Sequence, residues 1–276
     1  MTVLCPVCQT PITTTEDGGV CRKGHRFDRA RSGYMHLLPA NRKHAKNPGD
    51  DKLMVDARRK FLDKGYYRPL ADTVSRLASE WLANLPHQTP CVLDAGCGEG
   101  YYTAGIYEAL TAAGKQPKMA GTDISKFILR HAARRCRAVE FAVASSYHLP
   151  LADGAVELLL DCFSPLALEE FRRVLSPGGT FLYVVPAADH LWQLKEVLYD
   201  HPYPNEEKET PYEGFAYETI VPVDADITLP CGEDIQNLFR MTPYCWKTPK
   251  SGVERLAQLT ELTVRTAFRI HVFRKL

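Results

Sequence analysis

Long apolar runs are missing from this 276-residue sequence, which contains no stretch of about 18 uncharged apolar residues. A helix that spans a membrane needs such a stretch, so the sequence predicts no association with a membrane. The first residues, Met-Thr-Val-Leu-Cys, also lack the basic and apolar regions of a secretory signal peptide. We therefore expect a cytoplasmic protein.

The nine cysteines are spread over a long chain rather than concentrated in a short secreted one, which favours free thiols and metal ligands over disulfides. Near the N-terminus, Cys5-x2-Cys8 and Cys21-x3-His25 are separated by 12 residues. Three thiolates and one imidazole at this spacing suit a closed tetrahedral zinc site. A redox Cys-x-x-Cys is the alternative, but that motif normally starts a helix and needs no second ligand pair. We predict one structural zinc ion per chain.

A large net charge is also absent, since the formal value is +1 at pH 7. This total hides an asymmetry, because residues 22–68 hold 14 Lys or Arg against 5 Asp or Glu. That segment has a net charge of +9, and the rest of the chain has −8. A basic segment can neutralise phosphates, which favours a nucleic-acid partner, although a solvated basic face is the alternative. The positions expected to contact phosphate are Arg22, Lys23, Arg26, Arg29, Arg31, Arg42, Lys43 and Lys46.

Strand and helix patterns alternate after Pro90, and this order predicts a parallel, doubly wound α/β sheet. The predicted strands are 91–95, 119–123, 139–144, 156–161 and 180–185, and the predicted helices between them are 102–113, 126–135 and 166–175. Residues 51–85 predict two earlier helices, broken at Gly65 and Pro69. A helix to about Tyr199 and a last helix and strand at 253–259 and 262–273 complete the pattern.

Composition divides the chain into three predicted parts. They are a zinc-binding module at residues 1–36, a basic connector with helices at 37–85, and a nucleotide-binding domain at 86–276 with an irregular excursion at about 200–250.

A glycine-rich loop follows the first strand of the predicted sheet at Gly96-Cys97-Gly98-Glu99-Gly100. Glycines there let the backbone approach a ligand closely. The dinucleotide fingerprint Gly-x-Gly-x-x-Gly is absent, which argues against a pyrophosphate cofactor. S-adenosylmethionine has no phosphate and carries an ammonium, a sulfonium and a ribose diol, so the carboxylates of Asp94 and Glu99 suit it.

The second predicted strand ends at Asp123, where a carboxylate can accept hydrogen bonds from both ribose hydroxyls. We expect the adenine near Ile124 and Ala144-Ser145-Ser146. The alternative is structural, with Asp94 capping one helix and Asp123 opening the next. Together with the later Ser176-Pro-Gly-Gly179 turn, the pattern across residues 90–185 resembles class I methyltransferases.

A closer resemblance covers nearly the whole chain and is strongest over residues 1–150. The residues that carry it are the zinc motif, His25-Arg26-Phe27-Asp28, Gly33-Tyr34, Leu37-Leu38-Pro39, Asp50, Ala57-Arg58-Arg59, Phe61-Leu62, the run from Asp94 to Thr103 and Ala144-Ser145-Ser146. With these residues the chain resembles the bacterial 23S ribosomal RNA guanine-N1 methyltransferases.

The resemblance implies methyl transfer to N1 of one guanine in a hairpin loop of domain II, by a homodimer whose zinc modules help to line an RNA cleft. It also implies that Tyr67 and His190 lie near S-adenosylmethionine, although packing or helix capping is the alternative for both. We expect Tyr101, directly after the glycine loop, to bind the same cofactor. The family has two branches that modify different guanines of this loop, and one branch is linked to macrolide resistance. The sequence does not choose between the branches.

The fourth predicted strand ends at Asp161-Cys162-Phe163-Ser164-Pro165, which departs from the Asn/Asp-Pro-Pro-aromatic motif of many base amino-methylating enzymes. Guanine N1 carries a proton that a base must remove, and Asp161 is the hypothetical base, with a cap or donor contact as the alternative. Phe163 is a candidate for stacking on the target base, or else a core residue. Tyr244 and Trp246 are either stacking platforms or, as we expect, a buried aromatic pair.

Three other functions remain open at this point. A nicotinamide-dependent oxidoreductase shares the strand, the glycine loop and the acidic strand end, but it would need the missing glycine fingerprint. A zinc-stabilised RNA-binding protein would not need the set formed by Asp94, Gly96, Gly98 and Asp123. A methyltransferase acting on a small molecule or a protein is disfavoured only by the +9 segment.

Overall fold

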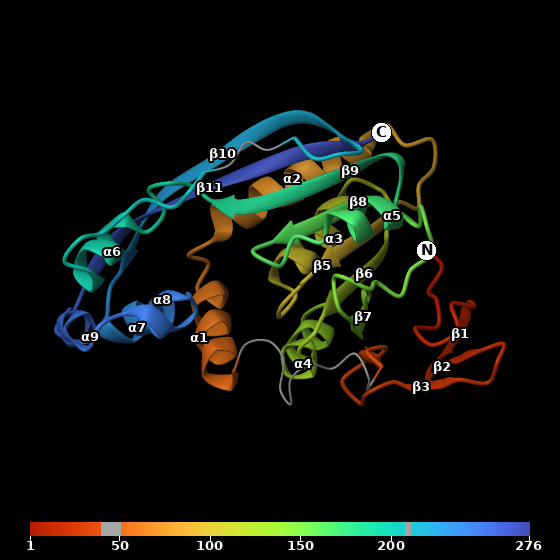
Figure 1. Ribbon diagram of the computed structural model, residues 1–276, viewed down its shortest axis with the longest axis horizontal. Helices are drawn as coiled ribbons and strands as arrows, with labels where there is room; N and C mark the ends of the chain where they lie inside the picture. The colour runs from red at the N-terminus through yellow and green to blue at the C-terminus, as the bar shows by residue number, and fades with distance from the viewer. Residues whose placement is uncertain (40–50, 208–210) are drawn as a thin grey trace.

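The computed structural model describes residues 1–39, 51–207 and 211–276, and its strands form two sheets (Figure 1). The three-stranded sheet holds β1 (Ile12–Thr15), β2 (Gly18–Cys21) and β3 (Arg26–Asp28) in antiparallel order. The eight-stranded sheet has the order β10-β11-β9-β8-β5-β6-β7-β4. Its strands are β4 (Met35–His36), β5 (Cys91–Ala95), β6 (Lys118–Asp123), β7 (Glu140–Val143), β8 (Val156–Cys162), β9 (Leu175–Pro186), β10 (Phe215–Leu229) and β11 (Leu262–Lys275).

Strands β4 to β9 run parallel to one another, which confirms the predicted α/β fold. The last strand, β11, lies antiparallel between β9 and β10. The helices are α1 (Lys52–Asp63), α2 (Arg68–Ala83), α3 (Tyr101–Ala112), α4 (Lys126–Arg135), α5 (Leu168–Val174), α6 (Trp192–Leu198), α7 (Gly232–Arg240), α8 (Tyr244–Lys247) and α9 (Lys250–Ala257). None of these helices, nor any other helix within the described ranges, is long and apolar enough to cross a membrane.

Both faces of the large sheet are covered, because alternate strand residues point to opposite sides. In β8, Leu158 and Leu160 pack in the same cluster as α2, α3 and α4, whereas Leu159 packs with α5. The sheet is therefore a buried layer between helices, and ligands reach it from the carboxyl ends of its strands.

The two predicted helices before the sheet are present as α1 and α2. Asp51 caps α1, since its side chain accepts a hydrogen bond from the Met54 backbone at 2.8 Å. The helix ends before Gly65, whose φ of +79° is a left-handed conformation that favours glycine. Pro69 then stands in the first turn of α2, where its missing N–H costs nothing.

The expectation of an irregular excursion over residues 200–250 is wrong for most of that range. Residues 215–229 form the long edge strand β10, and α7 and α8 follow it. This strand was not predicted because it contains Pro222, Asp224 and Asp226, residue types that are rare in strands. An edge strand tolerates them, because only one of its sides must pair and one face meets solvent.

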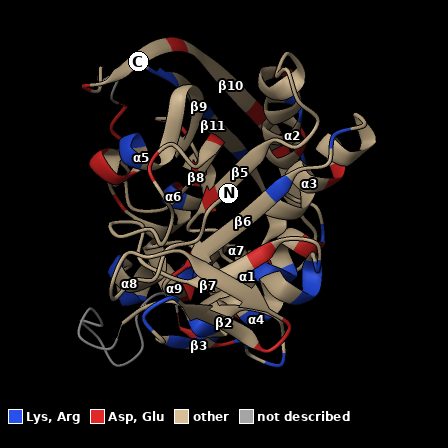
Figure 2. Cartoon of the chain, turned by 90° about the vertical axis from the view of Figure 1, so that its right-hand side faces the viewer, with Lys and Arg blue, Asp and Glu red and all other residues tan. Residues whose placement is uncertain are grey.

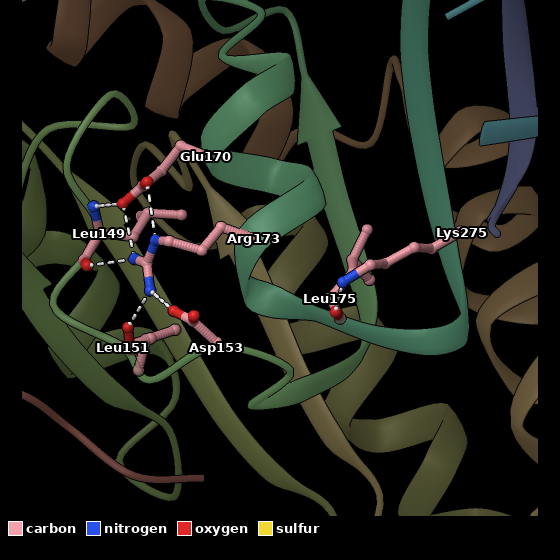
Figure 3. Close-up of polar contacts among 7 residues, drawn as sticks. All are labelled: Leu149, Leu151, Asp153, Glu170, Arg173, Leu175 and Lys275. Carbon is pink, nitrogen blue, oxygen red and sulfur yellow. Dashed lines mark hydrogen bonds and ion pairs between the residues drawn. The ribbon is translucent and has the colours of Figure 1, made fainter. Parts of the chain in front are cut away.

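The N-terminal segment is attached to the large sheet through the loop after β7. Backbone hydrogen bonds run from Leu4 to Pro150 at 2.8 Å and from Ala152 to Thr2 at 3.1 Å. Arg173 of α5 holds that loop in place (Figure 3), because its guanidinium donates to the Leu149 and Leu151 carbonyls at 3.0 and 2.7 Å. The same guanidinium binds Glu170 and Asp153, each at 2.7 Å.

Candidate active site and metal centre

The side chains of Cys5, Cys8, Cys21 and His25 converge, as the sequence predicts. Their ligand atoms all lie within 4.8 Å of one another. The Cys8 and Cys21 sulfurs are 3.6 Å apart, and His25 Nδ1 is 3.3 Å from Cys21 Sγ and 3.5 Å from Cys5 Sγ. Tetrahedral zinc with Zn–S bonds of about 2.3 Å spaces its sulfur ligands by roughly 3.8 Å, so this donor set fits the ion.

Two tight turns form this metal centre. The Gln9 amide donates to the Cys5 carbonyl at 2.8 Å, and the Gly24 amide donates to the Cys21 carbonyl at 2.9 Å. The Thr10 hydroxyl lies 3.2 Å from Cys8 Sγ and is the main reason that the pKa of this thiol falls to about 6. A lowered pKa favours the thiolate, which is the form that binds a metal.

The glycine loop joins β5 to α3 and lies against the next strand. The Gly96 and Cys97 amides donate to the Thr122 carbonyl at 2.7 and 2.9 Å. Gly96 has a φ of +84°, and a Cβ at this position would lie 2.3 Å from the Ser164 side chain. No other residue fits there without displacing Ser164, so the close approach of the two loops explains this glycine.

A cavity of about 860 Å³ opens at the carboxyl ends of β5, β6 and β8, and we call it the main cavity. The structure brings most of the residues predicted to bind S-adenosylmethionine to the wall of this cavity, together with Ala144, Ser145 and Ser146. These predicted wall residues are Tyr67, Gly96, Cys97, Gly98, Glu99, Asp123, Ile124 and His190. Gly100 and Tyr101 stand at the start of α3 and are not in the wall.

Asp94 also lies outside the wall, behind the glycine loop, with 1% of its surface exposed. Thr103 donates to one carboxylate oxygen at 2.5 Å, while the other oxygen has no hydrogen-bond partner among the described residues. Burial raises the pKa of Asp94 to about 7. A buried carboxylate with an unsatisfied oxygen fits a site that receives a cationic ligand. Burial likewise raises the pKa of Glu99, against the opposing effect of Arg58.

Asp123 joins the loops on either side of it. Its carboxylate accepts from the Ser125 amide at 2.8 Å and from the Gly98 amide at 3.2 Å. The carboxylate therefore faces the glycine loop at the rim of the main cavity, where the sequence predicts the ribose contact. Ile124 follows it in the cavity wall.

Tyr67 and His190 form a buried pair in the wall of the main cavity. The Ala267 amide donates to His190 Nδ1 at 3.2 Å, which places the ring proton on Nε2. Nε2 lies 3.4 Å from the Tyr67 hydroxyl and donates to it. Burial lowers the pKa of His190 to about 3, so the ring is neutral. The Tyr67 hydroxyl proton is thus left available to donate elsewhere.

Asp161 is fully buried at the end of β8 and is not in the cavity wall. One carboxylate oxygen accepts from the Ser164 amide at 3.0 Å, and the other has no partner among the described residues. Burial raises the pKa of Asp161 to about 7. The Ser164 hydroxyl donates to the Ala95 carbonyl at 2.8 Å, so Asp161 supports the loop that lines the cavity.

The aromatic candidates differ in their surroundings. Phe163 lies in the cavity wall, is 47% exposed and contacts Phe268 with ring centroids 5.6 Å apart. Tyr244 also lines the cavity. The expectation of a buried pair with Trp246 is wrong, because Trp246 is 68% exposed on the short helix α8.

The predicted phosphate-contacting residues separate into two groups. Arg22, Lys23, Arg26 and Arg31 are exposed, whereas Arg29 binds the Gly33 carbonyl at 2.8 Å and Glu140 at 2.9 Å. Arg42, Lys43 and Lys46 lie outside the described residues.

Comparison with known proteins identifies both parts of the chain. Residues 3–46 match the zinc-ribbon family described as RlmA, N-terminal, and residues 92–179 match a methyltransferase domain family. A Streptomyces fradiae protein named 23S rRNA (guanine(748)-N(1))-methyltransferase is 38% identical over 196 residues, which cover 70% of this chain and 66% of that protein. YxjB of Bacillus subtilis strain 168, whose name carries the same reaction class, is 30% identical over 262 residues, covering 92% of this chain and 90% of that protein.

The chain belongs to the 23S rRNA (guanine-N1)-methyltransferase family. It therefore has an S-adenosylmethionine-dependent methyltransferase domain and an N-terminal zinc-ribbon site, as predicted. The fold is also similar to the crystal structure of the YcgJ protein of Bacillus subtilis, with a TM-score of 0.50 and 17% identity over 74% of this chain and 98% of that one.

Sequence reasoning missed several wall residues of this family member, including Arg58, Tyr183 and Phe268. Phe268 comes from β11, far from the glycine loop in sequence, and its ring centroid is 5.0 Å from that of Tyr67 and 4.5 Å from that of His190. No local pattern marks such a residue. Arg58 did stand in a motif of the family resemblance, which was the available signal.

Proposed function

We propose that this enzyme transfers the methyl group of S-adenosylmethionine to N1 of a guanine in the domain II hairpin loop of 23S ribosomal RNA. The observation that carries the proposal is the main cavity of about 860 Å³. It holds the glycine loop and Asp123 at one end and the aromatic side chains of Phe163, Tyr183 and Tyr244 elsewhere in its wall. Methyl transfer needs one space that holds both S-adenosylmethionine and the guanine flipped out of its loop, so that the methyl group lies next to N1.

The donor supplies an electrophilic methyl group on a sulfonium when it is bound. We assign Asp94 and Glu99 to its cationic groups and Asp123 to its ribose hydroxyls. Gly96 and Gly98 allow close approach of the backbone, and Ile124 contacts the adenine. Tyr67 directs its hydroxyl proton toward the donor because His190 Nε2 already donates to the hydroxyl oxygen. Cys97, Gly100 and Tyr101 complete the loop that carries these groups.

We also propose that the target guanine swings out of its loop and stacks on Phe163, whose side chain is 47% exposed. A general base must remove the N1 proton, and Asp161 is the proposed base. Its pKa of about 7 suits proton removal near neutral pH, and its second oxygen is unsatisfied. Because it lies just behind the wall, a small shift of the 161–164 loop is needed for contact.

Asp161→Asn tests this assignment without removing the support for the loop, because the asparagine oxygen can still accept from the Ser164 amide. If Asp161 is the base, methyl transfer falls by at least about 100-fold at pH 7 and loses the rise in rate around that pH. Unchanged turnover of the variant would leave Asp161 with only its structural role.

The remaining proposals concern organisation. We propose a zinc-binding module at residues 1–36, a connector at 37–85 and a methyltransferase domain at 86–276. We also propose a cytoplasmic homodimer, which the family resemblance supports. Sedimentation equilibrium tests the dimer directly, and a single species of 31.0 kDa at micromolar concentration would contradict it.

The substrate class is tested with radiolabelled S-adenosylmethionine and separate acceptors. We expect label in 23S RNA from a strain that lacks the modification and none in transfer RNA or in cell protein. Label that appears only in protein or in small molecules would overturn the proposal and favour the methyltransferase alternatives.

A further inference from the structure

A second cavity, of about 700 Å³, lies where the N-terminal segment meets α4, and we call it the arginine cavity. Figure 2 shows blue segments in this part of the molecule, around β2, β3 and α4. The arginines that line the cavity are Arg29, Arg31, Arg130, Arg134 and Arg137.

Most of this positive charge is not neutralised by the residues that the structure describes. Glu140 is the one acidic residue among those that line the cavity, and Arg29 binds it at 2.9 Å. The other four arginines form no ion pair with any residue of the described ranges, and Arg31, Arg130, Arg134 and Arg137 are exposed. Four guanidinium groups around one hollow repel each other unless an anion enters it.

The arginines come from two rigid parts. Arg130 and Arg134 are four residues apart on α4 and so lie on one side of this helix, whereas Arg137 follows the end of the helix at Arg135 and lines the same cavity. Arg31 stands on a tight turn in which the Gly33 amide donates to the Ala30 carbonyl at 2.7 Å and the Ala30 amide donates to the Tyr34 carbonyl at 2.8 Å.

The floor of the arginine cavity is buried and apolar. It consists of Tyr34, Ala133 and Val139, and Gly33 packs beside Ala133, since a Cβ on this glycine would lie in ordinary van der Waals contact with the alanine Cβ, at 3.6 Å. The N-terminal segment and α4 are thus in direct contact beneath the arginines. The backbone that carries the arginines is therefore fixed beneath the cavity.

We propose that the arginine cavity binds backbone phosphates of the substrate RNA, an inference that rests on the proposed function. Arginine binds phosphate oxygens through two parallel N–H donors, and these contacts position RNA without reading its sequence. Helix α4 also contributes Ile128 to the main cavity, while Arg130 lines the arginine cavity. One helix therefore couples the grip on the backbone to the site that receives the guanine.

The test compares two triple variants with the same change in charge. R130Q/R134Q/R137Q removes three cavity arginines, whereas R76Q/R172Q/R274Q removes three from elsewhere, with side chains 53%, 42% and 53% exposed. Binding of a fluorescent hairpin RNA is measured by anisotropy from 50 to 300 mM salt. Affinity for S-adenosylhomocysteine, which should match the wild type in both, shows that the variants are folded.

We expect the cavity variant to bind RNA at least about 10-fold more weakly than the control. We also expect its salt dependence, as log Kd against log salt, to lose about 2 units of slope, since each phosphate contact contributes roughly 0.7 to 0.9. R130K/R134K/R137K should keep most of the slope because it keeps the charge. Equal RNA affinity of the cavity and control variants overturns the inference. Failure of the wild type to methylate RNA overturns the proposed function instead, and the binding comparison still decides the role of the cavity.

Discussion

Asp94→Asn should make the ligand-free enzyme more stable and its donor binding weaker. The Asp94 carboxyl is 1% exposed, and one of its oxygens has no partner among the described residues. Burial raises its pKa from 3.8 to about 7. A neutral amide of the same shape avoids the burial of a charge, and its oxygen still accepts from Thr103.

The magnitude follows from the two pKa values. The folded wild-type protein holds the Asp94 proton more tightly than the unfolded chain does. Protonation of Asp94 therefore contributes its full stabilisation of the fold below about pH 4, and this stabilisation is lost as the pH rises to about 7. A shift of this size corresponds to on the order of 4 kcal/mol, at about 1.36 kcal/mol per pKa unit. The stability advantage of the variant should therefore grow between pH 4 and 7 and stay constant above pH 7.

Urea unfolding at pH 5, 6, 7 and 8 measures this advantage without ligand, and calorimetry with S-adenosylhomocysteine measures the affinity. The ammonium of that ligand should favour the ionised carboxylate, so Asp94→Asn should lose at least about 10-fold in affinity at pH 8 and less at pH 6. Parallel stability profiles for wild type and variant, with no divergence between pH 5 and 8, would refute the assignment of a buried carboxyl with a raised pKa at this position.

Three further predictions concern other parts of the enzyme. Removal of zinc by a chelator should unfold the N-terminal module and abolish RNA methylation, while S-adenosylhomocysteine still binds. Loss of both RNA methylation and S-adenosylhomocysteine binding, or loss of neither, would contradict a structural ion confined to that module. Tyr67→Phe should weaken the affinity for S-adenosylmethionine by about 5- to 10-fold. The loss should be equal at pH 6 and pH 8, because His190 stays neutral with a pKa of about 3. Calorimetry measures both affinities, and a loss that depends on pH would contradict this prediction. Arg173→Met should lower the free energy of unfolding by about 2 kcal/mol, because the four partners of Arg173 in Figure 3 lose a charged hydrogen-bond donor. Urea unfolding measures the change. A decrease of under about 0.5 kcal/mol would show that these contacts do not stabilise the fold.

Features encoded by neighbouring residues were predictable from the sequence. The zinc site depends on two short spacings, and the glycine loop depends on a strand followed at once by Gly96 and Gly98. Both signals are local, since the backbone of a few residues sets the geometry. Asp123 was predictable for a related reason, because the carboxyl ends of adjacent parallel strands meet at one edge of the sheet.

Features that depend on distant pairing were not predictable. Strand β10 contains Pro222 and two aspartates, and only its pairing with β11 makes it a strand. Phe268 reaches the main cavity because β11 lies beside β9, which no local pattern reveals. The arginines of α4 form a cavity only because the turn at Arg31, which is distant in sequence, lies against them. Asp161 shows the converse, since its strand-end position was predicted correctly while its separation from the cavity wall was not visible.

Methyl transfer to N1 of one guanine is tested by mapping the position of the product. Purified enzyme is incubated with S-adenosylmethionine and unmodified 23S RNA, and the RNA is then read by primer extension, which a methyl group on N1 blocks. We expect one new stop, at a guanine of the domain II hairpin loop, that disappears when S-adenosylmethionine is omitted. RNA that carries label but shows no stop in that loop would contradict it.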